Sequence, residues 1–167
     1  MSPVQDDLDR IAEQERRLQF DHFDESTAWQ LGATLRNRAA ERGRNVTIEV
    51  RLAGHTVFLT AMPGTAPANA DWARRKRNVV ELLRRSSYGV GLEAKVTGRS
   101  LLDEMGLPTR DHAAHGGAFP ITVAGIGFVG VVTVSGLPQR EDHELVVEVL
   151  AELCGVGYDD VRLHTQD

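Results

Sequence analysis

The stretch from Gly116 to Gln139 contains no charged side chain, which limits the chain to folds that bury it. A run of this length could cross a bilayer. Pro120 and five glycines from Gly116 to Gly130 interrupt it, however, and β-branched residues alternate within it, which disfavours a membrane helix. We therefore predict two buried strands, 119–124 and 128–135, and no insertion into a membrane.

The connection between these strands spells G-x-G-x-x-G, from Gly125 to Gly130. In a dinucleotide site such glycines open a helix whose amides face the pyrophosphate. Here the strand-forming residues 131–134 follow instead, and too little chain remains for further βαβ units. We predict that these glycines form a hairpin that lets another backbone approach closely, and that the protein binds no nucleotide.

The rest of the chain alternates between helical and strand periodicity. A hairpin is expected where residues alternate over 46–52 and 55–62 around Ala53-Gly54. Helices are expected over about 3–17, from a cap at Asp24 or Ser26 to Gly43, over 71–86, and from Pro138 to Cys154. Residues 63–69 read as a loop. The pattern predicts one α+β domain over 1–167, with helices packed on a mostly antiparallel sheet.

Composition places this domain in a reducing compartment. The 167 residues suffice for one core. Cys154, the single cysteine, has no internal partner and is expected to be a buried thiol. The first residues are acidic and lack the apolar segment of a secretory signal. We expect a cytoplasmic protein.

The charge is uneven, with a basic middle between two acidic ends. Residues 26–135 hold fourteen bases and eight acids, within a chain of formal charge −5. A nucleic-acid surface would need aromatic side chains between the bases, and these are missing. Neutralisation by the acidic ends explains the pattern, so we predict no nucleic-acid partner.

The helix over 71–86 has an apolar and a basic side. Its apolar side is expected to hold Trp72, Val79, Val80, Leu82 and Leu83, and its solvated side Arg74, Arg77, Glu81, Arg84 and Arg85. Lys76 falls inside the apolar arc and Arg75 at its edge. Lys76 either extends its stem along the apolar surface toward water or points at an anionic ligand or a neighbouring subunit.

Two His-bearing segments could carry chemistry. His112 and His115 lie three apart in a loop next to Asp111, and neutral imidazoles there could share a metal ion or face a haem edge. The signal for a metal is weak, and hydrogen bonding within the loop is the favoured interpretation. Asp142 and His143 stand in the first turns of the last helix. Asp142 points inward there, so it must find donors: amides of the preceding turn, His143 or Lys76.

An ordered set of motifs resembles the haem-degrading domain family, and specifically the cytoplasmic branch beside its HbpS, GlcG and PduO C-terminal groups. The matching segments are Trp72-Ala-Arg-Arg-Lys-Arg-Asn78, Ser86-Ser-Tyr88, His115-Gly-Gly-Ala-Phe-Pro-Ile121, Val134-Ser-Gly-Leu-Pro138, Asp142-His143 and Leu145-Val-Val147. The resemblance implies a profilin-like fold with a central antiparallel sheet of about five strands flanked by helices. It also implies dimers that build a larger closed oligomer.

The resemblance further implies haem as ligand, with slow oxidative degradation in some members. It leaves open whether this chain is an enzyme. Candidate ligand-binding residues are Arg75, Lys76, Tyr88, His115, Ser135, Asp142 and His143; a metal ion, iron or zinc, would use His112 and His115. No C-x-x-C-H is present, which excludes covalent haem. The alternative is a non-enzymatic assembly protein with a chaperone partner, in which the same side chains line subunit contacts.

Overall fold

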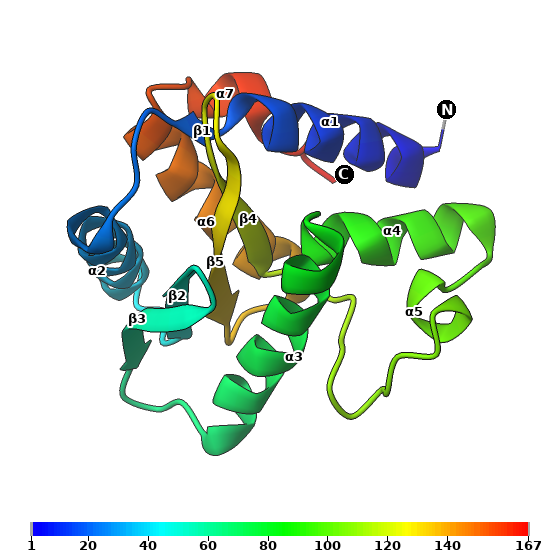
Figure 1. The fold of residues 1–167 in the computed structure, drawn as a ribbon, viewed down its shortest axis with the longest axis horizontal. Helices are drawn as coiled ribbons and strands as arrows, with labels where there is room; N and C mark the ends of the chain where they lie inside the picture. The colour runs from blue at the N-terminus through cyan, green and yellow to red at the C-terminus, as the bar shows by residue number, and fades with distance from the viewer. Residues whose placement is uncertain (1, 167) are drawn as a thin grey trace.

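A five-stranded sheet organises the computed structural model, which describes residues 2–166 (Figure 1). Its strand order is β1-β4-β5-β2-β3. The strands are β1 (Gln19–Phe20), β2 (Thr47–Leu52), β3 (His55–Ala61), β4 (Ala118–Val123) and β5 (Gly127–Ser135). The α+β arrangement with about five strands and flanking helices is confirmed.

The sheet is mixed because its edge strand β1 runs parallel to β4, whereas the other neighbours pair antiparallel. With two residues, β1 is too short to show a strand period in the sequence. The predicted close approach at the glycine-rich hairpin is confirmed at Gly130, where a Cβ atom would collide with the carbonyl oxygen of Arg51. Gly127 and Gly130 lie within β5 itself, as the predicted hairpin requires.

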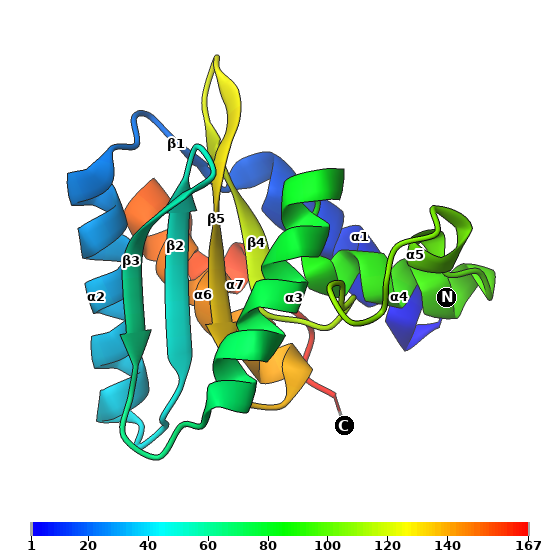
Figure 2. The same ribbon diagram turned by 60° about the horizontal axis from the view of Figure 1, so that its bottom comes forward.

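Helices cover both faces of the sheet (Figure 2). On one face, α2 (Glu25–Glu41) and α6 (Gln139–Cys154) enclose the main core with the inward side chains of β2, β4 and β5. The opposite face carries α3 (Pro67–Leu83), which packs Val80 against Ala118 and Val131. The predicted uncharged strands are therefore buried between two helical layers.

The third helix begins four residues before the predicted start. Pro67 stands at its first position, and the side chain of Asn69 accepts a hydrogen bond from the amide of Ala66, so the segment read as a loop already forms the first turn.

The sheet-facing side of α3 is also rotated relative to the prediction. Leu82 is 49% exposed, whereas Arg77, expected on the solvated side, lies against β2 and pairs with Glu49 at 3.0 Å. This partner on the sheet allows a base on the packed side of the helix.

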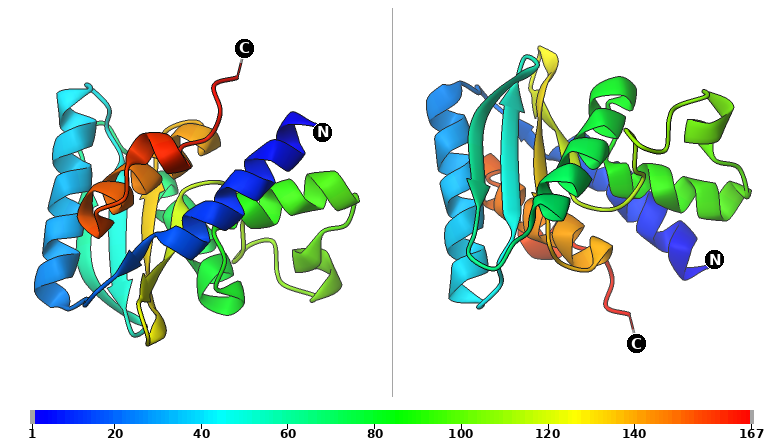
Figure 3. Two further views of the ribbon diagram at one scale, coloured as in Figure 1. Left: turned by 90° about the horizontal axis from the view of Figure 1, so that it is seen from above. Right: turned by 90° about the horizontal axis from the view of Figure 1, so that it is seen from below.

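Two further helices pack together beside the sheet (Figure 3). The expected N-terminal helix is α1 (Pro3–Arg17), capped by Ser2, and it lies alongside α4 (Ser87–Thr97). Two short helices remain: α5 (Leu101–Glu104), which follows α4, and α7 (Tyr158–Val161), which follows α6. Within residues 2–166, no helix has the length and apolar character needed to cross a membrane.

Candidate functional site

A cleft of about 280 Å³ lies where the first half of α3, the glycine turn before β4, the end of β5 and the start of α6 meet. These segments are the ones that carry the motifs noted in the sequence. The lining residues are Asn69, Trp72, Lys76, His115, Gly116, Ser135, Gly136, Leu137, Gln139 and Asp142. Four of the candidate residues, Lys76, His115, Ser135 and Asp142, thus line one cleft.

Lys76 lies at the floor of the cleft and is only 3% exposed. Its ammonium group donates hydrogen bonds to the carbonyl oxygens of Gly116 at 3.0 Å and Val134 at 2.8 Å, and to Asp142 Oδ2 at 3.2 Å. Burial lowers the pKa of Lys76, and the charge of Asp142 opposes that shift. Lys76 therefore does not extend to solvent: its three donors hold the floor together, and none is left for a ligand.

Asp142 completes this buried pair from the first turn of α6. Its carboxylate accepts from the amides of Gly136 at 3.3 Å and Leu137 at 3.0 Å, besides the ammonium of Lys76. The donors that the sequence required are therefore the preceding turn and Lys76. Burial raises the pKa of Asp142 to about 6, although Lys76 and the two amides favour the ionised form.

Trp72 and His115 line the cleft, and Trp72 also contacts the guanidinium of Arg75, which does not itself line the cleft. Trp72 is 39% exposed; its ring meets that of His115 edge-on at 5.1 Å, and the guanidinium carbon of Arg75 lies 4.6 Å from its centre. His115 is exposed, and partial burial with the nearby charges of Lys76 and Arg75 lowers its pKa, which favours the neutral imidazole near pH 7. Arg75 forms no ion pair within residues 2–166.

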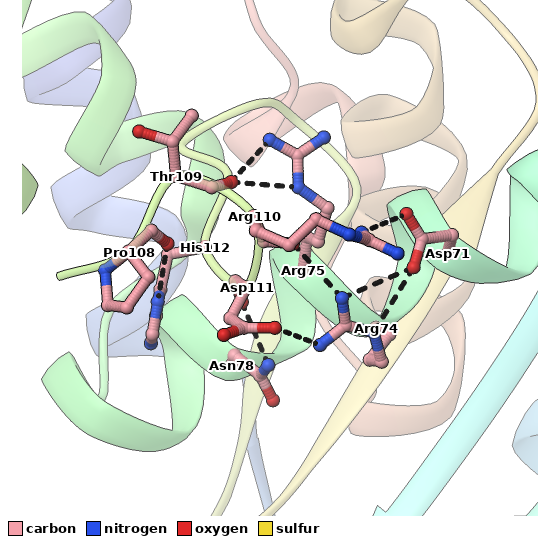
Figure 4. Close-up of polar contacts among 9 residues, drawn as sticks. All are labelled: Asp71, Arg74, Arg75, Asn78, Pro108, Thr109, Arg110, Asp111 and His112. Atoms are coloured by element: carbon pink, nitrogen blue, oxygen red, sulfur yellow. Dashed lines mark hydrogen bonds and ion pairs between the residues drawn. The ribbon is translucent and has the colours of Figure 1, made fainter.

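The loop that precedes His115 is held along α3 by polar contacts (Figure 4). Arg75 donates to the carbonyl of Thr109, Asn78 donates to that of Asp111, and Arg74 pairs with the Asp111 carboxylate at 2.9 Å. His112 Nδ1 lies 3.1 Å from the carbonyl oxygen of Pro108, so the predicted hydrogen-bonding role accounts for that side chain. The described residues contain no cluster of three or more His, Cys, Asp or Glu suited to a metal ion.

Tyr88 and His143 do not reach the cleft lining. Both are buried beneath α1, where their rings lie 5.2 Å apart, and His143 donates through Nε2 to Gln14 Oε1 at 2.8 Å. Complete burial, with the charge of Arg140, lowers the pKa of His143 to about 3. These two residues therefore serve the packing of α1 in this structure.

Two lining residues went unnoticed in the sequence. Gln139, at the start of α6, accepts from the amide of Gly116 through Oε1 at 3.2 Å, and Asn69 lies in the first turn of α3. Pro67 signals a helix start and could have drawn attention to Asn69. No local signal distinguishes Gln139, because its partner is 23 residues away.

The model of a family described as "Haem degrading protein HbpS-like" matches residues 23–151, which include every segment of the cleft. The chain belongs to the HbpS-like family.

Among its HbpS-like relatives, a UPF0303 protein of Azotobacter vinelandii is 60% identical over 157 residues, which cover 94% of this chain and 95% of that protein.

Solved structures support the fold of this HbpS-like chain. The Ybr137w protein superimposes with a TM-score of 0.81 at 27% identity, over 89% of this chain and 87% of that one. A structure described as a PduOC:heme complex gives 0.65 at 17% identity, over 78% and 94%. At that identity the second likeness shows a shared fold alone.

Proposed function

We propose that this HbpS-like protein binds haem, or another planar anionic ligand, at the rim formed by Trp72, Arg75 and His115. The observation that carries the proposal is an exposed imidazole and an exposed indole lining one cleft, with the guanidinium of Arg75 stacked on that indole and without a carboxylate partner within residues 2–166. The relationship to haem-degrading proteins favours haem over other planar anions.

The side chains of His115, Arg75 and Trp72 have the chemical groups that such a ligand requires. His115 supplies a neutral nitrogen, which iron accepts as a ligand. Arg75 can pair with an acidic group of the ligand, and Trp72 offers an apolar face. Bound haem would supply iron for oxidative chemistry. The cleft itself, at about 280 Å³, is below the size typical for drug-sized ligands, so we place only an edge of the ligand inside it and the rest over the rim.

A haem titration followed by the Soret band tests this proposal. Wild-type protein should give a shifted band of defined stoichiometry, His115→Ala should lose it, and Arg75→Gln should weaken binding about tenfold, as expected for one charge-assisted contact. His22→Ala is the matched control, because His22 is exposed and does not line the cleft. His112→Ala examines whether the second loop histidine shares the iron. An unchanged titration with His115→Ala refutes the proposed site.

We further propose self-association in the cytoplasm, through the edge of the sheet at β3. Trp29 is 67% and Leu59 63% exposed beside this edge, and both line a groove with Phe58 and Val57. An unpaired strand edge with exposed apolar side chains favours pairing with a second copy. Sedimentation of Trp29→Glu against wild type tests this: a smaller species is expected. An unchanged mass would refute self-association through this groove and would favour its use by a different protein, such as a chaperone.

A further inference from the structure

A second hollow, of about 530 Å³, lies at the other end of α3. Its walls come from the start of β5, the β2–β3 turn and the segment before α2, all at the end of the sheet from which the β4–β5 hairpin projects (Figure 2). The lining residues are Phe23, Leu52, Ala53, Gly54, Glu81, Arg84, Phe128, Val129 and Gly130. Arg84 follows Trp72 by twelve residues, so this hollow lies roughly 18 Å along the helix from the cleft.

Arg84 occupies a position where glycine is the usual residue. It ends α3 in the left-handed conformation, with φ +57°, which side chains with a Cβ atom adopt reluctantly. The arginine places its guanidinium over the ring of Phe128, 5.1 Å from the ring centre, at the wall of the hollow. The chain thus accepts local strain where the side chain faces an apolar cavity.

The charge of Arg84 has no counterpart in the part of the chain that the structure describes. Its guanidinium forms no ion pair or hydrogen bond within residues 2–166. Glu81, the one carboxylate in the lining, pairs with Arg51 at 2.8 Å. The hollow therefore combines apolar walls with one unpaired cation.

We propose that this hollow binds an amphipathic carboxylate, an apolar chain or ring system carrying one acidic group. The carboxylate would pair with Arg84, and the apolar body would lie against Phe128, Leu52 and Phe23. The volume is within the range of small-molecule sites, and a mainly apolar lining with two charged side chains, Arg84 and the Arg51-paired Glu81, matches their usual design. A guanidinium already stacked on an aromatic ring can still donate from its edge to a carboxylate.

Calorimetric titration with octanoate, compared with octanol, tests the site. We expect octanoate to bind once per chain and octanol at least tenfold more weakly. Arg84→Gln should weaken octanoate binding tenfold or more. Arg84→Gly should lose the same binding while its melting temperature is equal to or above that of wild type, because glycine relieves the positive φ. Lys95→Gln, which removes an exposed lysine outside this hollow, should bind as wild type does.

Amide chemical shifts locate the bound octanoate independently. Shifts concentrated at residues 128–130 support the proposal, and shifts at the groove around Trp29 overturn it. Equal affinity for octanol, or octanoate binding unaffected by Arg84→Gln, also overturns it. The test is separate from that of haem binding: His115→Ala should keep octanoate affinity, and loss of the Soret response in that variant bears only on the cleft.

Discussion

Replacing Lys76 by methionine should destabilise the protein strongly, and more so at high pH. Methionine keeps the length of the apolar stem but removes the ammonium group. Asp142, 2% exposed, would retain two amide donors, and the carbonyls of Gly116 and Val134 would each lose a donor. Removing one partner of a buried ion pair costs about 3–5 kcal/mol in the free energy of unfolding.

The pH dependence follows from Asp142. Its folded pKa, about 6, is above the ordinary value of 3.8, and loss of Lys76 should raise this pKa further. Each additional pKa unit changes the free energy of unfolding by about 1.4 kcal/mol between low and high pH. A raised acid pKa favours folding at low pH, and this advantage is lost as pH rises through the folded value. The variant's deficit should therefore approach its full size at pH 8. At pH 5, where Asp142 is largely protonated, we expect about 1–2 kcal/mol, from the lost carbonyl bonds alone.

Urea unfolding followed by far-ultraviolet circular dichroism, at pH 5 and pH 8, measures both deficits. The double variant Lys76→Met with Asp142→Asn removes both charges of this buried pair and should show a deficit nearly independent of pH. A deficit below about 1 kcal/mol at pH 8 would contradict the reasoning, since it would lie far under the cost of breaking a buried pair. An equal deficit at both pH values in the single variant would show that Asp142 does not titrate as described.

Three further outcomes are expected. Gly117→Ala should unfold at a markedly lower temperature in calorimetry, because φ is +137° and the new Cβ atom would collide with the carbonyl oxygen of Val134. Gln14→Leu should lose about 1–3 kcal/mol in urea unfolding and expose the C-terminal segment to protease, since Gln14 donates to the carbonyl of Val161 at 2.7 Å. Cys154 should react slowly with a thiol reagent in native protein at pH 8 and quickly in urea, because burial raises its pKa to about 12; rapid native labelling would contradict this.

The sequence predicted the layers and the long elements because their periodicity is local. The strands around Gly130 and the helix of Lys76 follow from patterns within about fifteen residues. The two-residue strand β1 is too short for such a pattern, and the rotation of α3 depends on Glu49, a partner from a different strand. The period of hydrophobic residues within one segment therefore predicts neither the strand β1 nor the rotation of α3.

The site was predictable to the same extent. Asp142 was expected to face inward and Lys76 to lie within the apolar arc of its helix, so each charge needed a partner. The structure pairs the two side chains with each other. The burial of Tyr88 and His143 could not be foreseen, because it depends on the packing of α1 and on Gln14, a polar residue in a helix that reads as amphipathic. Motif order brought both residues into the candidate set, although they serve a different part of the molecule.

The three acceptors of the Lys76 ammonium lie 40, 58 and 66 residues further along the chain. During synthesis on the ribosome, α3 therefore emerges long before the groups that neutralise its buried cation. Until the turn at Gly136 and the start of α6 leave the exit tunnel, this stretch has no stable place for that charge. The rim formed by Trp72 and His115 should accordingly take its final form only after the first turn of α6 has emerged and Asp142 can pair with Lys76.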